Sequence, residues 1–155
     1  MSTPAVHRPP RRRRATALLA VVFVAVAAAG CMPADARTFL DRTNALRKSE
    51  GVAALQENDI LTNKAEAWAQ HMASTRVLTH SVLSDGLSGL SWTALAENIG
   101  TSSPTSDTLL TIYNQFASSP PHRANMVSST YTHMGVGVAT DKYGHVWVAE
   151  VFARL

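Results

Sequence analysis

The sequence of 155 residues contains a single cysteine, Cys31. One cysteine cannot close a disulfide bond within the chain, so a folded domain must be held together by its hydrophobic core alone. The apolar content of 46% is sufficient for such a core, and the length suits one domain of the usual size. We therefore expect one domain without disulfide bonds.

Basic residues are scarce in the part of the chain that follows Cys31. Five of the fourteen arginines and lysines precede this cysteine, whereas all eleven acidic residues follow it. A surface that binds DNA or RNA needs an excess of positive charge, often with aromatic side chains between the basic ones. The sequence shows no such excess, and we expect no nucleic-acid partner.

The short motifs of common hydrolases are also missing. The segment Gly86–Leu90 fits the nucleophile elbow of serine hydrolases except at its last position, where leucine stands in place of glycine. No histidine begins a His-Glu-x-x-His zinc motif, and no glycine-rich loop for phosphate binding appears. These motifs therefore give no support to an enzymatic activity.

An apolar run must reach about 20 residues to form a typical membrane-spanning helix. The run at residues 15–30 is shorter than that, and it directly follows the basic cluster Arg11–Arg14. A basic cluster before a short apolar stretch is typical of a signal peptide. We expect residues 1–31 to direct export from the cell.

The end of this segment, Ala28-Ala29-Gly30-Cys31, resembles the lipobox at which bacterial lipoproteins are cleaved and lipidated. It predicts an acyl chain on Cys31 that anchors the protein to the cell membrane. The alternative is ordinary cleavage at an Ala-x-Ala site, such as residues 27–29 or 34–36, which would release a secreted protein. In the lipoprotein interpretation, residues 32–37 form a short linker and residues 38–155 form the domain.

Apolar residues that recur at helical spacing predict three helices. The first covers residues 35–49, the second residues 58–74 and the third residues 103–119. Asn58 suits the N-cap of the second helix, a Ser-Pro step opens the third, and a Pro-Pro pair ends it. Residues 79–101 are rich in serine, glycine and threonine and are predicted to form a long loop, a feature that is often functional.

The clearest strand signal lies at the C-terminal end of the chain. Residues 134–140 and 145–152 alternate in hydrophobicity around a turn at residues 141–144, which predicts an antiparallel hairpin. Gly135 and Gly137 leave one face of the first strand almost bare, so a helix or loop could pack closely there. Helices followed by strands favour an α+β fold with helices against an antiparallel sheet.

Three segments place polar side chains beside the boundaries of these elements. They are Leu78–Ser81 with His80, Ala96–Gly100 with Glu97 and Asn98, and Ser119–Met126 with His122 and Asn125. In this order, after the Ala65, Ala69 and Met72-Ala73 pattern and before Gly-Val-Gly-Val, they resemble the bacterial branch of the CAP superfamily (cysteine-rich secretory, antigen 5, pathogenesis-related 1), also called the SCP domain. The resemblance covers about residues 39–152 and implies a three-layer α-β-α sandwich.

The resemblance also implies a central cavity at which His80, His122 and Glu97 hold zinc or another divalent cation. Such a three-ligand set leaves an open position for water. The second acid that many family members carry on the preceding helix is absent here, and Glu150 on the last strand is a candidate substitute. Asn98 and Asn125 are expected to support the site by hydrogen bonds to loop backbone.

Three functions remain open. The first is an exported cell-envelope binding module that holds a divalent cation and takes a lipid, a small amphiphile or another envelope component. The second is a zinc-dependent hydrolase of peptide or cell-wall bonds, with Glu97 as the base. The third is a structural interaction protein of the envelope. We favour the first, because without a second acid Glu97 would have to act as ligand and base at once.

Overall fold

The structure is a computed structural model that describes residues 32–155. The predicted signal segment 1–31 and its candidate lipidation site, Cys31, lie outside the described residues. In chain order the elements are α1 (Ala34–Ser49), β1 (Gln56–Glu57), α2 (Asp59–Thr75), β2 (Ala94–Ser102), α3 (Thr108–Ser118), α4 (Pro120–Val127), β3 (His133–Thr140) and β4 (Val146–Arg154).

The strands form one sheet in the order β1-β3-β4-β2. The short β1 runs parallel to β3, and the other neighbours are antiparallel. β3 and β4 form the hairpin predicted from the sequence. Along this hairpin Gly135 pairs with Val151 and Gly137 pairs with Ala149. β2 lies at the edge of the sheet and pairs with β4 over its whole length.

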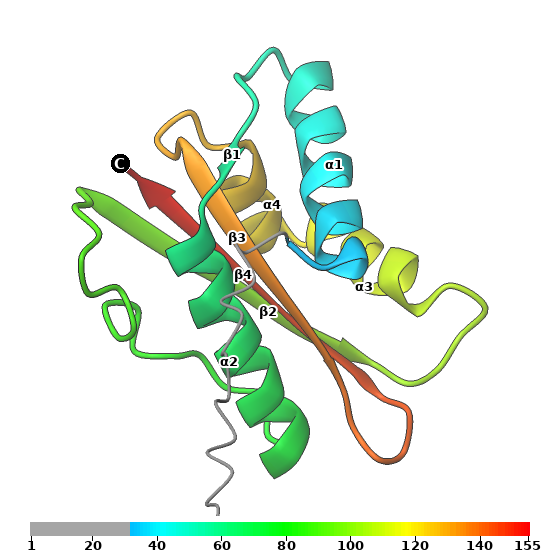
Figure 1. Ribbon diagram of the computed structural model, residues 1–155. Coiled ribbons are helices and arrows are strands. Elements are labelled where there is room, and N and C mark those ends of the chain that lie inside the picture. The colour runs from blue at the N-terminus through cyan, green and yellow to red at the C-terminus, as the bar shows by residue number, and fades with distance from the viewer. Residues whose placement is uncertain (1–31) are drawn as a thin grey trace, which may run out of the picture.

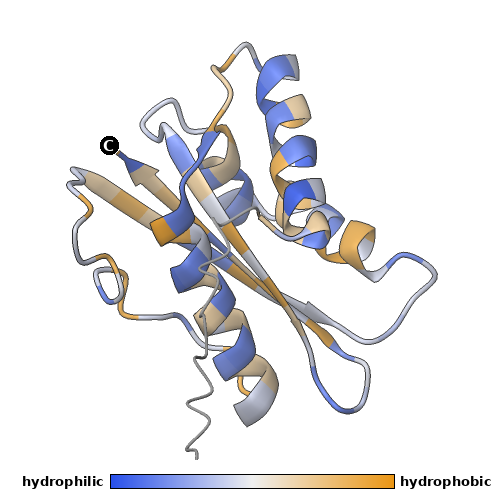
Figure 2. Cartoon of the chain, in the orientation of Figure 1, coloured by the Kyte–Doolittle hydropathy of each residue, from blue (hydrophilic) through white to orange (hydrophobic). Residues whose placement is uncertain are grey.

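Helices cover both faces of the sheet, which confirms the α-β-α sandwich (Figure 1). α2 lies on one face, and α1, α3 and α4 lie on the other. Figure 2 shows apolar residues along the strands and along one side of the helices. In the part of the chain from residue 32 onward, no helix has both the length and the apolar character needed to span a bilayer.

The first helix begins one residue before its predicted start at residue 35, and it includes residues that were also assigned to the linker. α1 starts at Ala34, so residues 34–37, which were expected in the linker, form its first turn. Pro33 stands at the N-cap, and Asp35 lies where the positive end of the helix favours an acid. Met32 and Ala36 are buried in the core, so this segment belongs to the domain and is not a free linker.

The close packing expected at the bare face of β3 is confirmed. α2 starts after Asn58, whose side chain accepts hydrogen bonds from two backbone N–H groups as an N-cap. A Cβ atom at Gly135 would lie 2.1 Å from the backbone of Leu61, and one at Gly137 would lie 2.1 Å from the backbone of Ala65. The two glycines therefore let the backbone of α2 lie directly on the sheet.

The prediction of a loop over residues 79–101 is wrong for its last part, because Ala94–Ser102 forms β2. This segment has few of the branched residues that favour strands. It becomes a strand because it pairs with β4, and tertiary pairing of this kind overrides local preference. Gly100 also allows close contact, because a Cβ atom there would lie 2.6 Å from the ring of Phe116.

The third predicted helix is shorter than expected, and a helix that the sequence did not predict follows it directly. α3 starts at Thr108 with Asp107 as its N-cap, several residues after the Ser-Pro step expected to open it. The Pro-Pro pair ends α3 and also occupies the first two positions of α4. Proline suits these positions because their N–H groups have no partner within the helix.

Candidate functional site

Glu97 and His80 are in direct contact. The His80 Nδ1 atom lies 2.8 Å from Glu97 Oε1, and because a carboxylate accepts, this nitrogen carries the proton. The next residue, Ser81, donates to the same carboxylate from its backbone N–H at 2.9 Å and from its hydroxyl at 2.7 Å. The Glu97 side chain is 1% exposed, whereas that of His80 is 61% exposed. Glu97 therefore holds His80 and the loop around it in place.

His122 is held in a similar way from the other side of β2. Its Nδ1 atom lies 2.9 Å from the hydroxyl of Ser119, at the start of α4. Its ring packs against Phe116 with 5.1 Å between ring centres. Burial lowers the pKa of His122 below its usual 6.5, and the charge of His80 lowers it further. The two imidazoles are thus within electrostatic range of each other, and His122 is neutral at pH 7.

The three-ligand set implied by the resemblance is not assembled. Within residues 32–155, no three side chains of histidine, cysteine, aspartate or glutamate lie close enough together to hold a metal ion. Both oxygens of Glu97 already accept hydrogen bonds from His80 and Ser81. Histidines that bind metals commonly donate their other ring N–H to such a carboxylate. Glu97 therefore lies where it orients His80, and it does not stand as a third ligand beside the two histidines.

Asn98, Asn125 and Glu150 form a connected network beneath His122. Asn98 Nδ2 donates to the backbone carbonyl of His122 at 3.1 Å and to Glu150 Oε2 at 2.9 Å. Asn125 Nδ2 donates to Asn98 Oδ1 at 2.9 Å. Asn98 thus holds the backbone of α4 and not, as predicted, that of a loop, and Asn125 donates to the Asn98 side chain.

Glu150 is fully buried on the central strand β4. Burial raises its pKa to about 8, and the hydrogen bond from Asn98 opposes this rise. Its Oε1 atom has no hydrogen-bond partner among the described residues. Glu150 faces the same side of the sheet as Val148 and Phe152, whereas Glu97 faces the side of Ile99. Glu150 therefore does not share a site with Glu97, and at pH 7 it is neutral.

Sequence reasoning missed the two serines that orient the histidines. Ser81 and Ser119 each lie within a segment that the sequence singled out, but their residue type carries no specific signal. A hydroxyl in such a segment could as easily face solvent or cap a helix. Only the hydrogen bonds to Glu97 and His122 show their role.

Comparisons with known proteins bear on the whole domain. A family model described as "Cysteine-rich secretory protein family" (CAP) matches residues 40–151. The curated protein YkwD of Bacillus subtilis (strain 168), itself described as uncharacterized, is 25% identical over 122 residues. The match covers 74% of this chain and 46% of YkwD, so the chain spans about half the length of this relative.

Solved structures with the same fold come from several sources. An outer surface protein of Borrelia burgdorferi has a TM-score of 0.68 and 17% identity, with 77% of this chain and 92% of that chain covered. An extracellular protein with an SCP domain from Bacillus anthracis (strain Ames) has a TM-score of 0.66 and 21% identity, with 78% and 40% covered. The protein NaASP2, solved with Zn²⁺, has a TM-score of 0.58 and 19% identity, with 79% and 83% covered. At these identities the likeness shows the fold alone.

Proposed function

The chain belongs to the cysteine-rich secretory protein (CAP) family, and within that family we propose that it is an exported binding module of the cell envelope with a divalent-cation site at His80 and His122. The ligand of the module is a lipid, a small amphiphile or another envelope component. The single observation that carries the cation site is the arrangement of the two histidines. Each is held through Nδ1, by Glu97 and by Ser119, which leaves both Nε2 atoms for a cation.

The protonation state of His122 supports this site. Metal ions bind the neutral imidazole, and the lowered pKa of His122 keeps it neutral at pH 7 without help from the metal. Zinc is the cation that two imidazoles and nearby oxygen donors suit well. The NaASP2 structure supports the same choice, because that protein has this fold and was solved with Zn²⁺.

The proposed location rests on the signal segment and on Cys31. Export followed by lipidation of Cys31 would place the domain at the outer side of the cell membrane, and cleavage without lipidation would release it. Two proteins with the same fold are described as an outer surface protein and as an extracellular protein, which supports export.

A zinc-dependent hydrolase is the second candidate, and the hydrogen bonds of Glu97 argue against it. A general base needs a carboxylate oxygen that can accept a proton from water. Both oxygens of Glu97 are occupied by His80 and Ser81, and Glu150 lies on the other face of the sheet. Binding is therefore favoured over hydrolysis. A purely structural role in the envelope is the third candidate and would need no cation.

The test is calorimetric titration of zinc into the full chain after removal of metals with a chelator. We expect binding of one zinc ion, lost in the double variant His80→Ala/His122→Ala with an unchanged circular dichroism spectrum. His133→Ala is the matched control, because His133 stands at the start of β3 and belongs to neither side of the site. Binding retained in the double variant, or absent from the wild type, would contradict the cation site.

A further inference from the structure

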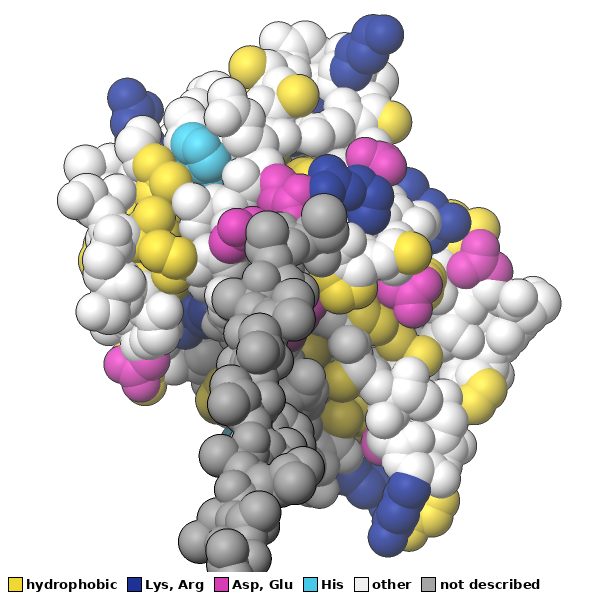
Figure 3. Space-filling view, viewed as in Figure 1, with side chains coloured by type: hydrophobic (Ala, Val, Ile, Leu, Met, Phe, Trp, Pro, Cys, Tyr) yellow, Lys and Arg dark blue, Asp and Glu magenta, His cyan; other side chains and the backbone are white. Residues whose placement is uncertain are grey.

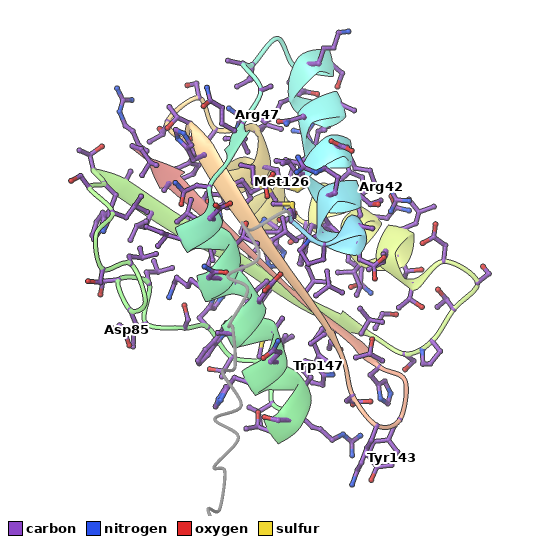
Figure 4. All side chains as sticks on the ribbon, in the orientation of Figure 1. Arg42, Arg47, Asp85, Met126, Tyr143 and Trp147 are labelled. Carbon is purple, nitrogen blue, oxygen red and sulfur yellow. The ribbon has the colours of Figure 1, made fainter. Side chains whose placement is uncertain are left out.

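A groove of about 360 Å³ runs between α2 and the loop that joins it to β2. One wall is formed by α2 residues at helical spacing, namely Lys64, Ala67, Trp68 and His71. The other wall is formed by the loop residues Ser81, Val82, Asp85 and Gly86. Figure 4 shows Asp85 at the outer side of this loop, and Figure 3 shows hydrophobic side chains on the surface at the same side of the molecule. The volume lies within the range of small-ligand pockets, about 300–1,000 Å³.

Two stacked aromatic rings form part of the α2 wall. The rings of Trp68 and His71 lie 4.6 Å apart with an angle of 19° between their planes. The indole N–H of Trp68 donates to the carbonyl of Thr79 at 2.8 Å, which fixes the orientation of the ring. The wall therefore presents a rigid aromatic surface of the kind on which the C–H groups of a flat ligand can stack.

The ammonium of Lys64 belongs to the same groove. Lys64 is 8% exposed, and its Nζ atom donates to the carbonyl of Val82 at 2.9 Å. An ammonium has three donors, and within the described part of the chain Val82 is the single recorded acceptor and no carboxylate lies within ion-pair distance. Because a ligand in the groove would displace water from this ammonium, its remaining donors favour a ligand with oxygen acceptors.

We propose that this groove binds a pyranose residue of a cell-envelope glycan. The sugar ring stacks on the outer face of the Trp68–His71 pair, its ring or hydroxyl oxygens accept from Lys64, and its hydroxyl groups donate to the carboxylate of Asp85. An acyl chain in the groove would leave the donors of Lys64 unpaired, so a lipid is disfavoured. The inference rests on the proposed function as a binding module and names the class of its ligand.

The groove lies next to the pair of His80 and Glu97, but neither of these residues lines it. Ser81 lines the groove and donates to Glu97 through both its backbone and its hydroxyl. A glycan bound in the groove would thus lie beside the pair of His80 and Glu97. Neither histidine of the cation site lines the groove, so glycan binding does not require a bound metal.

The experiment is titration of the full chain with chitotriose, a soluble trisaccharide of N-acetylglucosamine, in the presence of EDTA. We expect saturable binding that shifts the NMR signal of the Trp68 indole N–H and the amide signals of Ser81 and Asp85. Trp68→Ala and Lys64→Met should each weaken binding at least about tenfold. Trp92→Ala is the matched control, because Trp92 is 41% exposed and does not line the groove.

Asp85→Asn provides a variant that leaves the core untouched, because Asp85 is exposed, and it should weaken binding severalfold even if Trp68→Ala fails to fold. Absence of binding both to chitotriose and to purified peptidoglycan sacculi would overturn the inference. Equal loss in Trp92→Ala, or binding to phosphatidylglycerol vesicles that the groove variants abolish, would also overturn it. Because EDTA is present throughout, loss of glycan binding and loss of the zinc site are independent results.

Discussion

The two faces of the sheet are packed in opposite ways. On the α2 side, β3 presents Gly135 and Gly137, and the helix backbone takes the place that side chains would fill. On the other side, the alternate residues Met134 and Val136 enter a buried cluster with large side chains from α1 and α3, such as Phe39. Direct contact between backbones therefore fixes the distance between α2 and the sheet. The opposite face relies on side chains that can adjust.

The two buried glutamates extend this comparison. Glu97, on the α2 side, accepts from three donors, which is the environment that a charged carboxylate needs. Glu150, on the opposite side, accepts one hydrogen bond from Asn98 and is otherwise enclosed. The two buried glutamates thus differ in the number of hydrogen bonds that their carboxyl groups accept. One organises a polar site, and the other adds a neutral group to the core.

The largest effect should come from adding one methyl group to the α2 face. Gly137→Ala would bring a Cβ atom to 2.1 Å from the backbone of Ala65, which cannot move without displacing α2. We expect a loss of at least about 4 kcal/mol in the free energy of unfolding, measured in urea. Gly100→Ala on the other face is the matched comparison. There the Phe116 ring can shift, so we expect only about 1–3 kcal/mol. Equal losses would refute the contrast between the faces.

The next effect concerns the charge of Glu150. Its pKa rises from 4.5 in the unfolded chain to about 8 in the fold, so the folded state binds more protons between these values. The free energy of unfolding should therefore fall as pH increases from 4.5 to 8, by a few kcal/mol. Glu150→Gln should remove this fall and stabilise the protein at pH 8, with little effect at pH 4.5. Thermal melts across this range are the measurement, with Glu66→Gln on α2 as the control. A wild type with the same stability at both ends would contradict a neutral Glu150.

The smallest change in stability should come from the Glu-to-Gln substitution at Glu97. At pH 8 this substitution should destabilise the protein, whereas Glu150→Gln should stabilise it. Glu97→Gln puts an N–H₂ group where a carboxylate accepted hydrogen bonds, so one donor from His80 or Ser81 loses its acceptor. We expect a destabilisation of about 1–2 kcal/mol at pH 8, measured by urea denaturation. Zinc affinity should also fall by roughly 10–100-fold, because His80 loses the group that orients it. An unchanged zinc affinity would show that Glu97 does not position this histidine.

Much of the fold can be predicted from local patterns. The helical spacing of α2, its Asn58 cap and the hairpin of β3 and β4 are clear in the sequence and are confirmed. β2 is the main failure, because its residues carry no strong strand signal and become a strand only by pairing with β4. That failure extends to the site. Strand alternation sends Glu97 and Asn98 to opposite faces, which a loop assignment could not predict.

A second feature without a sequence signal is the buried Arg47 near the end of α1 (Figure 4). Its guanidinium donates to backbone carbonyls of Ala53 at 2.7 Å and of Met126 and Ser128 at 2.9 Å each. Burial lowers its pKa, and these carbonyls supply the hydrogen bonds that a buried cation requires. In the sequence, Arg47 looks like an ordinary basic residue in the last turn of a helix.

The sequence by itself determined the features whose physical cause is local. Spacing of apolar residues sets three of the helices, alternation sets the hairpin, and Gly135 and Gly137 mark a place where a helix or loop can lie close to the sheet. Tertiary structure alone decided the formation of β2, the burial of Arg47 and the separation of Glu97 from Glu150. Each of these depends on donors, acceptors or strand partners from segments far away in the chain. Hydrogen bonds of that kind exist only once the fold has brought the segments together.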